Sequence, residues 1–443
     1  MKSIHRAGPL FTDLYELTMA AGYYKHQIVS TATFSLFIRD YPSNRNFFVA
    51  TGLNDVLGEL ESFHFSPSDI DYLKTTQLFP PEFLSYLKTL RFSGDMYALP
   101  EGTIFFANEP IVEVTAPMIE AQILETLMLN TIGFSTMIAS KAARCIHAAN
   151  GRSLVDFSLR RTHEKDAGMK VARSTYIAGF NATSNVLAGK TYGIPISGTM
   201  AHSYISAFGS EFDAFSAYSD SFPENSIFLI DTYDTIQGAH HAVKVAKQME
   251  QKGHSLTGVR LDSGDMVMLS KKVRKILDNA GLFGVKIFAS SGFDEFKIAD
   301  YISQGAKIDA FGVGTKVGVS ADSPYLDIVY KVVRVKDRDT RKLSPGKITL
   351  AGKKQVFRRT GRQGLFLEDI IGLRDDSFKD GKPMLEKVME KGKRIGTYPS
   401  IEEIRNGFKN EFVLLDDKYK SLHDKQTYPV KLSDRLIKLQ KKL

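Results

Sequence analysis

The sequence predicts an α/β fold whose main domain is built on parallel strands. From Ser153 onward, short apolar segments recur along the chain, and most of them are separated by a helix-like stretch. This alternation is typical of β-α-β units, in which a helix connects neighbouring parallel strands. The segments are SLVDF, IPIS, SIFLID, LTGVRLD, VKIFAS and IDAFGVG, with LDIVYKVV as a possible seventh strand. The pattern fits either a barrel or an open doubly wound sheet.

Composition excludes several classes of protein. The 443 residues are enough for two or three domains, and 43% hydrophobic with 24% charged residues is ordinary globular usage rather than that of a disordered chain. The only cysteine, Cys145, lies in an apolar helical pattern. An intramolecular disulfide and a cysteine metal cluster are therefore excluded, and we expect Cys145 in the core of a protein from a reducing compartment.

Charge and hydropathy predict a cytoplasmic protein that binds neither membranes nor nucleic acid. The N-terminus MKSIHRAGPLFTDLYEL has no apolar signal segment, and we expect no membrane span of about 18 apolar residues. The net charge is +8, and much of the excess lies between Lys382 and Lys442, where lysines alternate with acidic residues at helical spacing. Such mixing is typical of a solvated surface, and no nucleic-acid motif accompanies it.

Three regions follow from the changes in pattern along the chain. Residues 1–117 are predicted to form an N-terminal α/β domain, and residues 118–335 the parallel α/β domain with connecting helices over 118–150. Residues 336–443 are predicted to form a C-terminal segment that packs back on the first domain. Near the start, Asp13 and Glu16 have the spacing of a capping box, which would open a helix carrying Tyr15 in its first turn.

The residues that follow the predicted strands are polar or small. In both candidate architectures ligands bind at the carboxyl ends of the strands. The residues found there are Asp156, Gly198, Asp231, Asp262, Ser290 and Gly314. The sequence therefore predicts a functional site at this edge of the sheet.

Two of the strand ends continue into glycine-containing turns, SSGFDE and GVGTKVGVS. A turn of glycine and hydroxyl residues before a helix directs several backbone N–H groups to one point, which suits a phosphate. Either turn alone also fits tight packing between a strand and a helix. Because they follow successive late strands, where barrel phosphate sites are typically formed, they favour a phosphate site.

Basic side chains follow or lie within two other strands. Arg160, Arg161, His163 and Lys165 come after Asp156, and clustered guanidinium groups can clamp pyrophosphate, although a salt-bridged surface loop is the alternative. Arg260 and Asp262 alternate on one strand and so share a face. An inward-facing Arg260 needs an anion, which could be a substrate carboxylate or a structural partner such as Asp262 or Asp265.

Two further segments carry groups suited to catalysis. GTMAHSYI places Thr199 and His202 after the IPIS strand, where the histidine could be a base, a ligand or a phosphoryl acceptor, or a structural residue. In SIFLIDTYDT, Asp231 and Asp234 could hold ribose hydroxyls, while helix capping is the competing role of Asp234. No HExxH or CxxC spacing occurs, so no protein-caged metal is expected.

Taken in order, these segments resemble the nicotinate phosphoribosyltransferase family. The motifs are TDLYELTMA, DFSLRR, STYIAGFNATSNVLAG, GTMAHS, LIDTYDT, GVRLDSGD and FGVGT, and they cover most of the chain. The resemblance implies an N-terminal α/β domain beside an irregular α/β barrel, usually in a homodimer. It also implies transfer of phosphoribose from phosphoribosyl pyrophosphate to nicotinate, coupled to ATP hydrolysis through a transient phosphohistidine, as an entry into NAD synthesis.

The resemblance also assigns roles to residues. His202 would be the phosphorylated histidine, with Asp231 and Asp262 as supports for the ribose and the reacting charges. Mg²⁺ would arrive on the pyrophosphate and ATP oxygens. The residues implied for nicotinate are Tyr15, supplied by the partner subunit to stack on the ring, with Arg160, Thr199 and Arg260. Those implied for phosphoribosyl pyrophosphate are Arg161, Ser291, Gly292, Gly314 and Thr315.

Three alternatives stay open. A nicotinamide phosphoribosyltransferase should carry a carboxylate after the Gly-Thr turn, where this chain has Met200. Quinolinate phosphoribosyltransferases are much shorter and lack the ATP-linked histidine. A non-catalytic nucleotide-binding protein on the same fold is the alternative from another class, because a fold does not fix a function.

Overall fold

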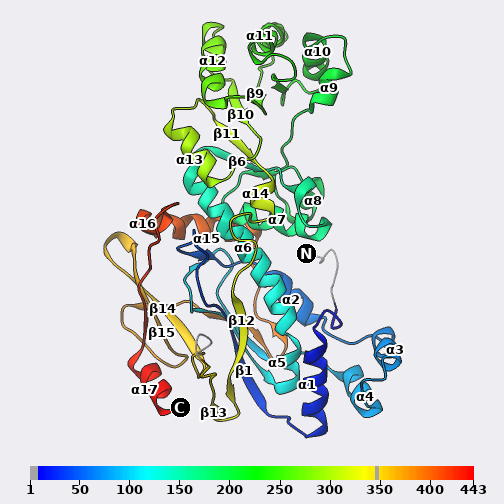
Figure 1. Cartoon of the computed structure of the whole chain (residues 1–443), viewed down its shortest axis with the longest axis vertical. Coiled ribbons are helices and arrows are strands. Elements are labelled where there is room, and N and C mark those ends of the chain that lie inside the picture. Colours follow the sequence, from blue (N-terminus) through cyan, green and yellow to red (C-terminus); the bar gives the residue numbers. More distant parts are fainter. Residues whose placement is uncertain (1–7, 345–348) are drawn as a thin grey trace. The chain divides into compact units, whose positions relative to one another are not determined.

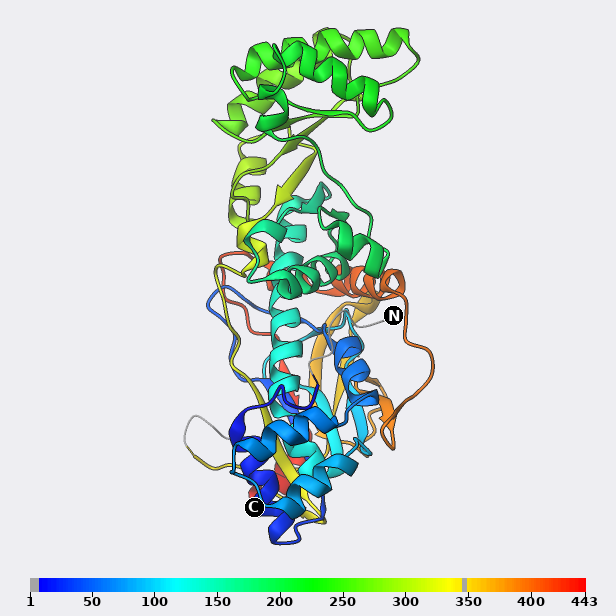
Figure 2. The same cartoon turned by 90° about the vertical axis from the view of Figure 1, so that its right-hand side faces the viewer.

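The computed structural model describes residues 8–344 and 349–443. Residues 1–7 of the predicted N-terminal domain and residues 345–348 of the predicted C-terminal segment lie outside the described residues. The chain divides into two compact units (Figures 1 and 2). The first unit comprises Met1–Ser140 and Ser323–Leu443, and the second comprises Lys141–Asp322.

The first unit is built on a seven-stranded sheet. The strand TATFSLFI is third in the order of this sheet, and seven of its eight residues are buried, including the polar residues Thr33 and Ser35. The sheet order is β13-β12-β1-β5-β3-β17-β18, and all its pairs are antiparallel. The strands are β1 (Thr31–Ile38), β3 (Asp95–Ala98), β5 (Pro110–Pro117), β12 (Ile328–Val335), β13 (Arg338–Asp339), β17 (Glu386–Glu390) and β18 (Lys393–Arg394).

Smaller sheets and helices complete this unit. The N-terminal helices α1, α3 and α4 lie side by side, in blue in Figures 1 and 2. The helices are α1 (Leu14–Lys25), α2 (Leu53–Glu61), α3 (Pro67–Thr75), α4 (Pro81–Thr89), α5 (Met118–Ile123), α6 (Glu125–Ala149, continuing into the second unit), α15 (Ile401–Leu414), α16 (Asp417–Lys420) and α17 (Asp434–Lys442). The other strands are β14 (Lys354–Thr360), β15 (Phe366–Leu373), β16 (Gly381–Pro383) and β19 (Val430–Leu432) in one sheet, and β2 (Phe48–Val49) with β4 (Ile104–Phe105) in another.

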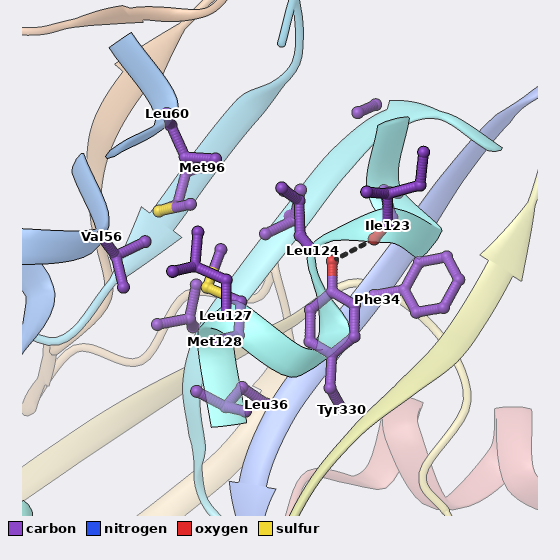
Figure 3. Packing of buried hydrophobic residues seen from close by; sticks show 14 of the residues in the cluster. Phe34, Leu36, Val56, Leu60, Met96, Ile123, Leu124, Leu127, Met128 and Tyr330 are labelled. Carbon is purple, nitrogen blue, oxygen red and sulfur yellow. Dashed lines mark hydrogen bonds between the residues drawn. The ribbon is translucent and has the colours of Figure 1, made fainter. Parts of the chain in front are cut away.

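The core of the first unit joins segments that are far apart in the sequence (Figure 3). The Phe34 ring of β1 stacks on Tyr330 of β12 with centroids 4.9 Å apart. The Tyr330 hydroxyl donates a hydrogen bond to the Ala121 carbonyl of α5 at 3.0 Å. This buried hydroxyl therefore keeps a partner, as burial of a polar group requires, and ties a late strand to the start of the connecting helices.

The second unit contains the parallel sheet that the sequence predicts. Its order is β7-β6-β11-β10-β9-β8, and every pair is parallel. Figure 1 shows β6, β9, β10 and β11 together, with α12 and α13 beside them. The strands are β6 (Ser153–Asp156), β7 (Ala182–Thr183), β8 (Ile227–Leu229), β9 (Gly258–Leu261), β10 (Lys286–Ala289) and β11 (Ala310–Val313).

Helices alternate with these strands, which confirms the β-α rhythm. The helices are α7 (Lys165–Ile177), α8 (Val186–Tyr192), α9 (His202–Ser206), α10 (Glu211–Ser221), α11 (Thr235–Gln251), α12 (Met266–Asn279), α13 (Glu295–Ser303) and α14 (Thr315–Gly318). Cys145 is free and buried, and burial raises the pKa of its thiol. Its predicted place in the core is confirmed.

Three sequence-based predictions of local structure are wrong. LDIVYKVV is not a seventh parallel strand, because β12 pairs antiparallel with β1 in the other unit. IPIS is not a regular strand, because it contributes only one isolated bridge, between Ile196 and Thr183. Thr183 belongs to β7, a two-residue strand that the sequence did not predict. Asp13 makes no side-chain cap on α1, because its carboxylate accepts a hydrogen bond from the Thr126 hydroxyl at 2.8 Å, and Glu16 is buried and accepts from Gln122 at 2.6 Å.

One run of helix, Met118–Ala149, is long and apolar enough to cross a membrane by length and composition, and it is unique in this respect among residues 8–344 and 349–443. Within the structure, 67% of its apolar window is buried. That burial explains the apolar composition, because a helix that packs on most of its surface has few polar positions.

Candidate active site

Arg260 is the central side chain at the carboxyl edge of the parallel sheet. One of its terminal nitrogens donates to the Thr199 hydroxyl and, at 3.1 Å, to the Met200 carbonyl. The other lies 3.7 Å from Asp262 Oδ1, and the side chain is 16% exposed. Its Nε finds no hydrogen-bond partner within the part of the chain that the structure describes. The guanidinium is thus fixed in place and still has donor capacity.

The environment of Arg260 favours an incoming anion. Burial lowers the pKa of Arg260, while the carboxylates of Asp262 and Asp231 oppose this shift and the positive charge of Arg160 adds to it. An arginine in proteins stays charged despite such a shift, so Arg260 remains a cation and its burial costs desolvation free energy. A bound carboxylate would relieve that cost. Of the two partners proposed for Arg260 from sequence, Asp262 is present, but only as a loose contact.

His202 opens helix α9 and lies between a hydroxyl and a carboxylate. Its Nδ1 is 3.1 Å from Thr232 Oγ1, and its Nε2 is 3.9 Å from Asp262 Oδ2. The imidazole side chain is 45% exposed. A half-exposed ring held at one nitrogen and facing a carboxylate with the other is accessible to a reacting group, unlike a structural histidine buried in a core.

Asp231 and Asp262 hold neighbouring strand ends together. Asp231 Oδ2 accepts hydrogen bonds from the Asp262 N–H at 2.9 Å and from Ser263 Oγ at 2.6 Å. Asp262 Oδ1 in turn accepts from the Ser290 hydroxyl. The other oxygen of Asp231 is buried and finds no partner in the described part of the chain. These contacts position both carboxylates and leave acceptor oxygens for a ligand.

Asp234 takes the competing role foreseen for it. Its side chain accepts hydrogen bonds from the N–H groups of Ile236 and Gln237 at 3.0 and 2.8 Å. It therefore caps helix α11.

Asp156 is a structural carboxylate beneath the arginine loop. It is buried, and it accepts hydrogen bonds from Thr183 Oγ1 at 2.8 Å and from the Ser158 N–H at 2.9 Å. Burial raises its pKa, and these hydrogen bonds oppose the shift. The contacts fix the turn after β6 and its junction with β7.

The arginine loop itself is exposed. Arg160 and Arg161 lie in a short 3-10 turn, Leu159–Arg161, and none of its residues is buried. Arg160 is close enough to Arg260 to affect its pKa. Both arginines are exposed on this turn, and the charge of Arg160 is among those that act on Arg260.

Sequence reasoning missed Phe157, which follows β6 directly. Its ring packs over Gly312 of β11, where an added Cβ would lie 2.4 Å from the ring. It is half-buried among the polar strand ends. The signal that could have found it is its place in DFSLRR, where an aromatic residue stands between the strand-end aspartate and the arginines.

The two predicted phosphate turns begin helices as expected. Ser291 and Gly292 have φ of 105° and 65°, and both are exposed ahead of α13. An added Cβ at Gly292 would meet nothing within 4 Å. Gly314 is the N-terminal residue flanking α14, and Thr315 is exposed at its start. The Lys316 Nζ of the second turn lies 2.6 Å from Asp294 Oδ2 of the first, so an ion pair joins them.

Comparison with known proteins agrees with this arrangement. Three family models match: the nicotinate phosphoribosyltransferase N-terminal domain over residues 10–133, the family model over residues 152–347, and the C-terminal domain over residues 377–440. The chain belongs to the nicotinate phosphoribosyltransferase family. It is therefore an enzyme of this class.

Relatives from several organisms match nearly the whole chain. A nicotinate phosphoribosyltransferase of Mycobacterium tuberculosis is 45% identical over 97% of this chain and 92% of its own length. That of Bacillus subtilis is 39% identical over 96% of this chain and 93% of its own. The crystal structure of human nicotinic acid phosphoribosyltransferase superposes with a TM-score of 0.87 at 27% identity, covering 98% of this chain and 99% of that one.

In this phosphoribosyltransferase, Tyr15 belongs to the first unit, whereas the cluster just described belongs to the second. It is in the first turn of α1, and 49% of it is exposed. Partial burial raises the pKa of its hydroxyl, and neighbouring Glu16 adds to the shift. Its ring is free enough to contact another molecule. The contact predicted from sequence, with nicotinate in the partner subunit, stays a prediction.

No group of three or more metal-ligating side chains is present in residues 8–344 and 349–443. The free oxygen of Asp231 and Asp262 Oδ2 are nevertheless carboxylate oxygens of the kind Mg²⁺ prefers.

Replacement of Gly312 tests the packing beneath the site. A Gly312→Ala Cβ would overlap the Phe157 ring, so the variant should lose about 1–3 kcal/mol of unfolding free energy, as overpacked cores do. Gly284→Ala, where an added Cβ meets nothing within 4 Å, is the matched control. Thermal unfolding of both variants measures the difference, and equal melting temperatures would contradict the described packing.

Proposed function

We propose that this enzyme joins nicotinate to phosphoribosyl pyrophosphate, forming nicotinate mononucleotide and pyrophosphate as an entry into NAD synthesis. The observation that carries the proposal is the desolvated Arg260, whose guanidinium is held by Thr199 and whose Nε is without a partner among the described residues. A planar carboxylate on a flat ring matches that fork of donors. Family membership supports the same reaction.

The transfer itself needs positioning and charge stabilisation. The C1′–O bond to pyrophosphate breaks and its electron pair leaves with pyrophosphate, while the lone pair of the ring nitrogen forms the new bond to C1′. Arg260, Thr199 and Arg160 are proposed to hold nicotinate so that its nitrogen faces C1′. Arg161 is proposed to contact the departing pyrophosphate. Asp231 and Asp262 are proposed to stabilise the developing positive charge on the ribose.

The two phosphate turns are proposed to bind substrate in the same step. Ser291 and Gly292 ahead of α13, with Gly314 and Thr315 ahead of α14, are proposed to bind the phosphates of phosphoribosyl pyrophosphate through backbone N–H groups. Mg²⁺ supplies charge neutralisation when bound to the pyrophosphate oxygens. The Asp231 and Asp262 carboxylates would provide its protein ligands.

ATP is proposed to act through His202. Its γ-phosphoryl group would move to the imidazole with ADP as leaving group, and water would later release phosphate. The exposed ring facing Asp262 supports this role, because a half-exposed imidazole can be reached by a nucleotide. Phosphorylation would add negative charge beside Arg260 and so couple ATP use to substrate affinity.

The enzyme is proposed to be a cytoplasmic homodimer in which the partner subunit contributes Tyr15 to each site. The tyrosine ring would stack on the pyridine ring of nicotinate by an offset contact. Its 49% exposure supports this role.

The reaction is tested by incubating the purified enzyme with phosphoribosyl pyrophosphate and Mg²⁺, offering nicotinate, nicotinamide or quinolinate, each with and without ATP. We expect nicotinate mononucleotide as the preferred product, stimulated by ATP. Preferred turnover of nicotinamide would contradict the assignment of Arg260 to a carboxylate. Ligand binding without turnover of any ring would indicate a non-catalytic relative.

The phosphohistidine role is tested with His202→Ala. ATP stimulation should disappear, while slow basal transfer persists because the groups around Arg260 remain. Initial rates with and without ATP measure this, and exposed His240 on α11 gives the control His240→Ala. Undiminished ATP stimulation in His202→Ala would exclude the assignment.

Sharing of Tyr15 between subunits is tested by complementation. Tyr15→Ala and Arg260→Ala homodimers should each be nearly inactive. Mixed and reassociated, they should recover about a quarter of the wild-type activity, since half of a random mixture is heterodimer and each heterodimer has one intact site. The rate is measured before and after mixing. No recovery despite proven subunit exchange would place Tyr15 in its own subunit's site.

A further inference from the structure

The turn ahead of α13 contains a non-glycine residue in an unfavourable backbone conformation. Ser291 has φ of 105°, and Gly292 follows with φ of 65°. A side chain at such a φ costs free energy, and residues of this kind persist only where neighbouring contacts hold them. The turn is one of the two proposed phosphate sites. The contacts that hold the Ser291 backbone in this conformation therefore affect the proposed phosphate site.

The contact that holds Ser291 comes from the helix that follows. The Lys297 Nζ donates a hydrogen bond to the Ser291 carbonyl at 2.9 Å. The ammonium itself is confined by two rings, because it lies 4.8 Å from the centroid of Phe293 and 5.4 Å from that of Tyr301. Burial lowers the pKa of Lys297, and the positive charge of Lys316 adds to the shift. The enzyme thus keeps a partly buried lysine whose bond is to a single loop carbonyl.

Holding this carbonyl also sets the direction of the next N–H group. The Ser291 carbonyl and the Gly292 N–H belong to one planar trans peptide, so they point in opposite directions. With the carbonyl fixed on Lys297, the Gly292 N–H must point away from Lys297. The space beside Gly292 is open, since an added Cβ would meet no atom within 4 Å.

The base of the turn is fixed separately. Asp294 caps α13 by accepting from the Lys297 N–H at 2.9 Å, and its other oxygen pairs with Lys316 at 2.6 Å. These contacts do not involve the peptide between Ser291 and Gly292, which is held instead by the hydrogen bond from the Lys297 ammonium.

From this geometry we infer that Lys297 is a positioning residue, which presets the Gly292 N–H toward a phosphate of phosphoribosyl pyrophosphate by holding the strained Ser291 peptide. The inference rests on the proposed function. Lys297 itself need not touch the substrate, and its effect is on the affinity of the phosphate turn rather than on the bond-making step.

The first test is a comparison of Lys297→Met with the wild-type enzyme. A hydrogen bond from a charged group is lost, so KM and the calorimetric Kd for phosphoribosyl pyrophosphate should rise about tenfold. The KM for nicotinate and kcat should each change by less than about twofold. Lys297→Arg should recover most of the affinity, and Lys272→Met, which makes the same replacement at an exposed lysine on α12, is the control.

A double variant separates positioning from general loss of structure. In a Ser291→Gly background the residue tolerates a φ of 105° without strain, so Lys297→Met should raise Kd less than it does with serine present. Equal penalties in the two backgrounds, or an unchanged Kd in Lys297→Met, would overturn the inference. If the wild-type enzyme turned over a ring other than nicotinate, the proposed function would fail, while the Kd for phosphoribosyl pyrophosphate would still decide the role of Lys297.

Discussion

The hydrogen bonding of one parallel sheet determines where the chemistry of this enzyme lies. Since β7, β6, β11, β10, β9 and β8 all run in the same direction, their carboxyl ends meet at one edge. Side chains about 30 to 60 residues apart in sequence thereby come into contact, as Asp231 does with the Asp262 N–H and Thr199 with Arg260. Asp231 continues the hydrogen bonding between β8 and β9 past the strand ends, because its carboxylate accepts from the Asp262 N–H, so the same side chain joins two strand ends and lines the site.

Electrostatics then decides what the edge can bind. Arg260 is largely buried and its pKa is lowered by desolvation, yet its closest acceptors are a hydroxyl and a carbonyl, with a carboxylate at 3.7 Å. A tight ion pair with Asp262 would have satisfied the cation and left nothing for a substrate. Because Asp262 instead accepts from Ser290, its charge is shared with a neighbouring strand end. The positive potential at Arg260 is thus only partly neutralised, which favours an anionic ring over a neutral one.

The sequence could predict the strand ends because their residues follow short apolar segments with a regular spacing, and Arg260, His202 and Asp231 lie in the second unit as expected. It could not predict pairing partners. LDIVYKVV has the composition of a buried parallel strand, yet it pairs antiparallel with β1, because both environments demand apolar residues. Glu16 has capping-box spacing, but its burial beside Gln122 overrides the local signal. The role of Lys297 could not be predicted either, because a lysine on a short helix is typical of a solvated surface. Its hydrogen bond to the Ser291 carbonyl is evident only from the structure.

Two buried polar groups of the site lack partners among the described residues, whereas the start of α13 is held by a buried network of ion pairs. Arg260 Nε and one oxygen of Asp231 are buried without partners among the described residues, and such groups destabilise a fold. Directly behind the strained turn, Glu295 is fully buried between Lys141 and Arg144, at 2.5 and 3.0 Å. Removing one member of such a network would leave a buried charge unpaired, which costs far more than a surface ion pair. The start of α13 is therefore rigidly anchored from inside, and a strained Ser291 peptide can be held on that anchor without the turn relaxing.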